Sequence, residues 1–196
     1  MKKIFYISIL MIFSLVATTS CINDLDTQPL DDNTFTVDRA YSSPESYVQG
    51  LAKIYSVFSV SGQNGAGESD IVGLDPGNSQ LLRSLWNLQV VTTDECKNSW
   101  GNDSWVPELN NNTWSTIKNE SIDGVYYRTM FLVALVNEYL KQTTDDKISS
   151  RGHNSIQNDI KLYREEARFM RAMAYSILMD LYGNPPFITE NDPIGG

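Results

Sequence analysis

The feature that most constrains the fold is an apolar repeat near the end of the chain. Between residues 156 and 182, apolar side chains recur at alternating spacings of three and four residues, which places them on one face of an α-helix. They are Ile156, Ile160, Tyr163, Ala167, Met170, Ala174, Ile177 and Leu181. Gly183 suits the position after a helix end, and Pro185 and Pro186 prevent continuation. The pattern predicts a long helix over about 156–182.

A second apolar face precedes it and predicts a helix over about 121–141. Its members are Ile122, Val125, Thr129, Leu132, Val136 and Tyr139. Two antiparallel helices joined by a turn, with small residues such as Ala167, Ala172 and Ala174 that permit close approach, form the unit of helical repeat proteins. Because no convincing strand pattern accompanies them, we expect an all-α fold of tetratricopeptide-like helix pairs with long irregular loops.

The first half of the chain alternates short helical patterns with polar loops. Ser43, Pro44 and Glu45 suit the cap and first turn of a helix, and an apolar stripe follows. That stripe is Tyr47, Leu51, Ile54, Tyr55 and Phe58. A brief helix is expected over 81–91, with Trp86 in the core, while residues 61–80 and 92–116 read mostly as loop.

The expected helices are too few to cover their own apolar faces. Helical repeats bury these faces against neighbouring repeats, and several repeats are needed for stability. We therefore expect this chain to be the front portion of a larger helical protein, apparently truncated after residue 196.

The first twenty residues have the pattern of a lipoprotein signal peptide. Lys2 and Lys3 precede an apolar stretch of residues 4–17, which is too short to span a bilayer of roughly 20-residue thickness comfortably. Small residues then lead to Cys21, the expected lipid attachment site. The alternative is an ordinary secretory signal with a cysteine nearby. Residues 21–42 are polar and acidic and predict an extended tether, so the folded domain is expected to occupy 43–196.

Charge and cysteine usage exclude several classes of partner. The formal net charge of −9 argues against nucleic acid and against an electrostatic hold on anionic lipid. Cys21 and Cys96 are the two cysteines, and a disulfide between them is the alternative to lipidation. Two cysteines cannot build a zinc site alone, and His153 lies in a polar stretch where we expect it to be exposed. We expect no metal, no cofactor and no catalytic residue.

Three stretches of the sequence resemble the SusD/RagB family of glycan-binding outer-membrane lipoproteins. The segment from Cys21 to Asp26 resembles the lipidated mature N-terminus of that family, and residues 92–96 (TTDEC) resemble an early family segment. The most specific match is residues 165–187 (EEARFMRAMAYSILMDLYGNPPF), which resemble the family's signature helix. Order and spacing also agree, and the resemblance covers the family's N-terminal portion.

The resemblance implies a function and partners. It implies a lipid-anchored protein at the cell outer membrane that faces the exterior and captures oligosaccharide or polysaccharide, starch among them, without breaking a bond. It also implies delivery to a SusC-like TonB-dependent transporter for nutrient uptake.

Candidate glycan-binding residues follow from the same resemblance and from the loop chemistry. Sugar sites combine flat aromatic faces with polar groups aimed at hydroxyls. Trp100 and Trp105 lie in a stretch rich in Gly, Asn and Asp, where burial is harder to arrange. In the resemblance, Arg83 matches a sugar-contacting arginine, Trp100 an aromatic platform and Asp103 an amide. Asn98 stands where a second tryptophan is expected, which puts an identical starch site in doubt.

Two alternatives remain at the level of sequence. The first is a helical-repeat lipoprotein that acts only in protein–protein docking. This alternative is favoured if the side chains of Trp100 and Trp105 pack inward. Exposed tryptophan rings beside Arg83 would favour glycan binding. The second is a glycosidase that uses Asp94 and Glu95. Adjacent carboxylates rarely point at one centre, so we expect that the protein is not an enzyme.

Overall fold

The computed structural model describes residues 36–62, 67–101, 103–115 and 119–193. The chain divides into two compact units, Met1–Val37 and Asp38–Gly196. The signal peptide, Cys21 and the tether as far as residue 35 lie outside the described residues. Within the part that is described, all regular elements are helices and none is a strand, so the all-α prediction is confirmed.

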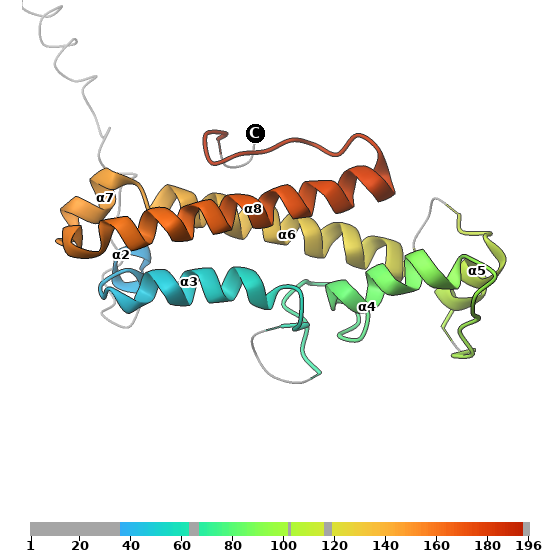
Figure 1. Ribbon diagram of the computed structural model, residues 1–196. Helices are drawn as coiled ribbons and strands as arrows, with labels where there is room; N and C mark the ends of the chain where they lie inside the picture. Colours follow the sequence, from blue (N-terminus) through green and yellow to red (C-terminus); the bar gives the residue numbers. More distant parts are fainter. Residues whose placement is uncertain (1–35, 63–66, 102, 116–118, 194–196) are drawn as a thin grey trace, which may run out of the picture. The chain divides into compact units, whose positions relative to one another are not determined.

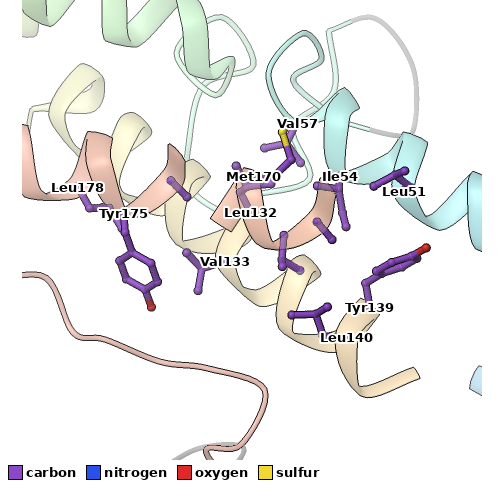
Figure 2. Packing of buried hydrophobic residues seen from close by; sticks show 13 residues of the cluster. Leu51, Ile54, Val57, Leu132, Val133, Tyr139, Leu140, Met170, Tyr175 and Leu178 are labelled. Atoms are coloured by element: carbon purple, nitrogen blue, oxygen red, sulfur yellow. The ribbon is translucent and has the colours of Figure 1, made fainter. Parts of the chain in front are cut away.

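The second unit is built on helices α6 (Glu120–Gln142) and α8 (Gln157–Tyr182), which lie side by side and antiparallel (Figure 1). Both bounds agree with the predicted helices to within one residue. Asn119 caps α6: its side-chain oxygen accepts from the N–H groups of Ser121 and Ile122. The predicted apolar faces meet in the core, where Leu132 of α6 and Met170 of α8 are buried (Figure 2).

Helix α3 (Glu45–Ser56) packs on both long helices and completes this core with Leu51, Ile54 and the following Val57 (Figure 2). Its predicted cap is wrong in detail, because Pro44 occupies the cap position and no side chain caps the backbone there. The stripe is confirmed except at Tyr55. That ring is exposed, and its hydroxyl donates to Glu166 Oε2 at 2.9 Å.

The connection between α6 and α8 is more ordered than the sequence predicted. It contains α7 (Asp145–Ser150) and a 3-10 turn, η2 (Asn154–Ile156). His153 is buried rather than exposed, and its Nδ1 lies 3.1 Å from the hydroxyl of Tyr47. The expectation failed because Tyr47 and His153 are distant in sequence, so no local pattern reveals their contact.

The predicted tether ends earlier than residue 42. A short helix, α2 (Val37–Ala40), lies in it. Asp38 forms an ion pair with Arg151 at 3.0 Å, and the ring of Tyr41 lies 5.4 Å from that of Tyr47. Residues 38–42 therefore belong to the helical unit, because they pack on it instead of extending from it.

The brief helix predicted over 81–91 is present in two parts. Residues Leu81–Trp86 form α4, and Asn87–Val91 continue it as a π-helix, η1. Leu81 and Val91 are buried at its ends. The expectation that Trp86 belongs to the core is wrong: its side chain is 53% exposed, because this face of α4 has no neighbour among the described residues.

Helix α5 (Trp105–Asn111) lies in the stretch that the sequence predicted as loop. Pro107 is tolerated because it falls in the first turn, where a backbone N–H has no intrahelical acceptor. Asn112 ends the helix in the left-handed conformation, with φ of 53°. The loop prediction was therefore wrong for these seven residues.

The segment after α8 turns back along that helix (Figure 1). Gly183, with φ of 77°, ends α8 as predicted. The hydroxyl of Tyr175 then contacts the backbone of Ile188 twice, accepting from its N–H at 2.7 Å and donating to its carbonyl at 2.8 Å. Arg171 of α8 pairs with Glu190 of this segment and donates to Asn137 Oδ1.

Several apolar side chains of α8 remain exposed. They are Leu162, Phe169, Met173 and Met179. No helix in the described part of the chain is long and apolar enough to cross a membrane.

Candidate functional site

Four of the five predicted glycan-binding residues line one pocket of about 370 Å³. They are Arg83 on α4, Trp100 and Asp103 on the following loop, and Trp105 at the start of α5. The lining also includes three residues that sequence reasoning missed, namely Asp75, Asn78 and Glu120. The volume lies in the range of small-molecule sites, about 300–1,000 Å³.

A buried arginine fastens the loop that supplies Asp75 and Asn78. Arg128 of α6 is fully buried, and its Nε donates to the carbonyl of Ser79 at 2.7 Å. Its Nη2 donates to the carbonyl of Ser61 and to the hydroxyl of Ser79. A carboxylate, Asp70, lies 2.7 Å from Nη1. These contacts hold residues 67–80 against α6, so the pocket wall rests on the long helix pair.

Asn78 is held from several sides at the pocket. Its carbonyl oxygen accepts from the hydroxyl of Ser84 at 2.7 Å and lies so close to Gly124 that a side chain there would overlap it. Its side-chain Nδ2 donates to Glu120 Oε2 at 2.9 Å. That bond leaves Oδ1 as the remaining acceptor, and this buried atom has no hydrogen-bond partner among the described residues.

Trp100 offers the exposed aromatic surface of the site. Its side chain is 64% exposed. Asn98 positions it: the backbone N–H of Trp100 donates to Asn98 Oδ1 at 2.9 Å, while Asn98 and Asn110 exchange two hydrogen bonds of 3.0 and 2.8 Å. Asn98 does not line the pocket. In this structure its hydrogen bonds shape the turn that carries Trp100, and its contact with a ligand remains a prediction.

Trp105 cannot present a ring face to a sugar in this structure. Only 3% of it is exposed, because it packs in a small cluster with Val91, Val106 and Leu109. The expectation that this loop disfavours burial was therefore wrong for Trp105, which begins a helix. Its indole Nε1 is buried and has no acceptor among the described residues.

The missed residues carried weak signals. Asp75 and Asn78 enclose Pro76 and Gly77, a turn sequence, and Asp75 Oδ1 accepts from the N–H of Gly77 at 2.7 Å. Glu120 is an acid in the first turn of α6, where a carboxylate favours the helix dipole. Each residue has a local role, and only the packing of α4 on α6 brings these residues to Arg83.

Other candidate chemistry finds little support in the described residues. Cys96 is half-buried and packs against the cluster around Trp105. It forms no disulfide within the part of the chain that the structure describes. No group of three or more His, Cys, Asp or Glu able to hold a metal ion occurs in the described ranges. A second pocket of about 480 Å³ at one end of α6 and α8 is mainly apolar and contains none of the predicted residues.

Comparison with known proteins identifies one curated relative. No family model matches the chain. Over 187 residues it is 30% identical to the starch-binding protein SusD of Bacteroides thetaiotaomicron. The match covers 95% of this chain and 31% of the relative, so the chain spans about a third of the length of the curated relative that it matches.

Proposed function

We propose that this chain, which belongs to the SusD/RagB family and corresponds to its N-terminal portion, binds a glycan in the pocket beside Trp100. The observation that carries the proposal is the convergence of Arg83, Trp100 and Asp103 on one pocket of ligand size. An exposed indole face stacks on a sugar ring, while a guanidinium and a carboxylate hydrogen-bond its hydroxyls.

The location and the partner belong to the same proposal. The protein is anchored through Cys21 to the outer membrane, faces the exterior, and hands its glycan to a TonB-dependent transporter. The signal-like residues 1–20 and the identity to SusD support this placement. Because the relative is a starch-binding protein, an α-glucan is the first ligand to try, and binding proceeds without bond cleavage.

The test is titration calorimetry of the purified chain with maltoheptaose and a panel of other oligosaccharides. Trp100→Ala is expected to weaken binding about tenfold, since an aromatic stacking contact is worth roughly 1.5 kcal/mol at most. Trp86→Ala is the matched control, because that indole is also exposed and lies outside the pocket lining. Unchanged affinity in the Trp100 variant would show that the indole of Trp100 does not stack on the bound sugar.

A role in protein–protein docking alone is the second candidate. The burial of Trp105 favours it, since one of the two expected platforms is lost, and so do the exposed apolar side chains of α8. If no oligosaccharide of the panel binds a folded chain, docking becomes the better account.

A further inference from the structure

The pocket carries an excess of negative charge. Three carboxylates line it, those of Asp75, Asp103 and Glu120, against the single guanidinium of Arg83. The carboxylates come from three separate segments, the loop before α4, the loop before α5, and α6. The excess therefore belongs to the pocket and not to one acidic stretch of sequence.

The carboxylate of Asp75 lies near Arg83, although no ion pair joins the two in the described part of the chain. A Cβ placed on Gly77 would lie 2.6 Å from Arg83 Nη1 and 2.9 Å from Asp75 Oδ1, so the guanidinium and that carboxylate converge on the same point. The two remaining carboxylates differ in their surroundings. Glu120 accepts from Asn78 Nδ2, whereas the carboxylate of Asp103 has no hydrogen-bond or ion-pair partner in the described ranges.

Two residues of the pocket lining each contain a buried polar atom that lacks a partner in the described part of the chain. Asn78 is 4% exposed and Trp105 is 3% exposed, and the Oδ1 of the first and the Nε1 of the second are unpartnered among the described residues. An acceptor and a donor left unpaired destabilise a protein. A hydroxyl both donates and accepts, so it can pair with an unpaired acceptor or an unpaired donor, whereas a carboxylate or sulfate only accepts.

We infer that this pocket selects neutral, hydroxyl-bearing sugars over anionic ones, and that Asp103 is the residue that sets the selectivity. The inference rests on the proposed glycan-binding function and sharpens it. A uronate or sulfate at the site meets Asp103 and Glu120 at short range, and a pair of like charges with poor screening is repulsive. A neutral hydroxyl donates to the same carboxylates.

The experiment compares two ligands of one shape and different charge. Maltoheptaose and its counterpart oxidised at C6 to glucuronate are titrated into the chain at low and high salt. The neutral ligand is expected to bind at least about tenfold more tightly at low salt, with the gap narrowing as salt screens the repulsion. Asp103→Asn, which removes charge but keeps shape, is expected to improve binding of the oxidised ligand about tenfold.

The control variant is Asp180→Asn, which makes the same change in net charge at an exposed position of α8 outside the pocket lining. It should leave the ratio of the two affinities unchanged. Equal binding of both ligands by the unmodified chain would overturn the selectivity and leave the glycan-binding function standing. Absence of binding to either ligand would overturn both. An equal response of the Asp103 and Asp180 variants would assign the selectivity to net charge and reject Asp103.

Discussion

The Nη1 atom of Arg128 lies 2.7 Å from Oδ1 of Asp70, in the buried space between helix α6 and the segment before α4. At this distance the two side chains form an ion pair, although the angles at Nη1 and Oδ1 are not those of a hydrogen bond. Together with the bonds from Arg128 to Ser61 and Ser79, it joins three stretches of sequence at one guanidinium. The pocket wall therefore depends on a side chain that does not itself line the pocket.

Replacing Arg128 with Met should destabilise the fold severely. The change leaves the mostly buried carboxylate of Asp70, whose side chain is 18% exposed, without its cation, and breaking a buried pair from one side costs about 3–5 kcal/mol of unfolding free energy. Urea denaturation measures the loss. Arg168→Met is the control, since Arg168 pairs with Glu165 at the surface, where a pair contributes about 0.5 kcal/mol. Similar losses in both variants would contradict this account of Arg128.

Gly124→Ala should weaken the attachment of the Asn78 loop to α6. The new Cβ would overlap the backbone carbonyl of Asn78, which cannot turn aside as a side chain can. Overpacking of this kind costs about 1–3 kcal/mol, which exceeds the gain of about 1 kcal/mol from replacing a helical glycine with alanine. Thermal unfolding compares it with Gly101→Ala, whose nearest atom is Ser99 O at 3.9 Å. A melting temperature at or above that of the parent would refute the clash.

The carboxyl group of Glu190 should make the free energy of unfolding depend on pH in the acidic range. Burial tends to raise the pKa of its carboxyl, but the hydrogen bond and charge of Arg171 outweigh burial and lower that pKa below its ordinary value of 4.5. A lowered folded-state pKa stabilises the fold above the unfolded value, and the contribution disappears as pH falls through the folded value. The stability gap between the parent and Glu190→Gln should therefore be largest near neutral pH and should close as the pH falls through the lowered folded-state pKa of Glu190.

Chemical denaturation across that pH range measures the gap. Glu165→Gln provides the comparison, because Glu165 is exposed and its ion-pair partner among the described residues, Arg168, is a neighbour on its own helix. A gap that widens in acid would show that the Arg171 contact does not hold Glu190 in its charged form.

Cys21→Ala should abolish lipid attachment. When the chain is expressed in a bacterium supplied with radiolabelled palmitate, the label is expected on the parent and on Cys96→Ala, and not on Cys21→Ala. The reason is that the Cys21 thiol is the expected point of acylation, so its removal leaves no atom to carry the label. Stable membrane anchoring, which takes more than one acyl chain, should be lost with it. Label retained by the Cys21 variant would disprove the lipoprotein signal.

Local patterns predicted the long helices and failed where structure depends on distant contacts. Helices α6 and α8 show their apolar faces at helical spacing over many turns, so their bounds were predictable. Helix α5 was missed because seven residues are too few to display a helical period, and its burial comes from the packing of Trp105 and Leu109 on Val91, which lies outside the helix. His153 was misplaced for the same reason, since its partner Tyr47 is far away in sequence.

The candidate site was predicted in outline. Resemblance and loop chemistry brought Arg83, Trp100 and Asp103 together, and the structure places them at one pocket. Glu120 could not be predicted, because the packing of α6 on α4 brings it to the site, and its partner Asn78 lies 42 residues earlier in the chain. The inward turn of Trp105 was equally unpredictable, since an aromatic residue in an Asn-rich stretch can begin a buried helix or remain in solvent.

The π-helical segment of residues 87–91 separates the two parts of the chain that furnish the pocket. Arg83 precedes it, whereas Trp100 and Asp103 follow. A π turn accommodates one residue more than an α turn, so a deletion here can be absorbed by a return to ordinary helix. Everything downstream would then keep its direction, whereas the same deletion in a purely α-helical segment would rotate it by about 100° around the axis. Relatives that lack one residue in this stretch should therefore present the same aromatic loop to the same surroundings, so that side-chain identity, rather than length, diversifies the recognition surface.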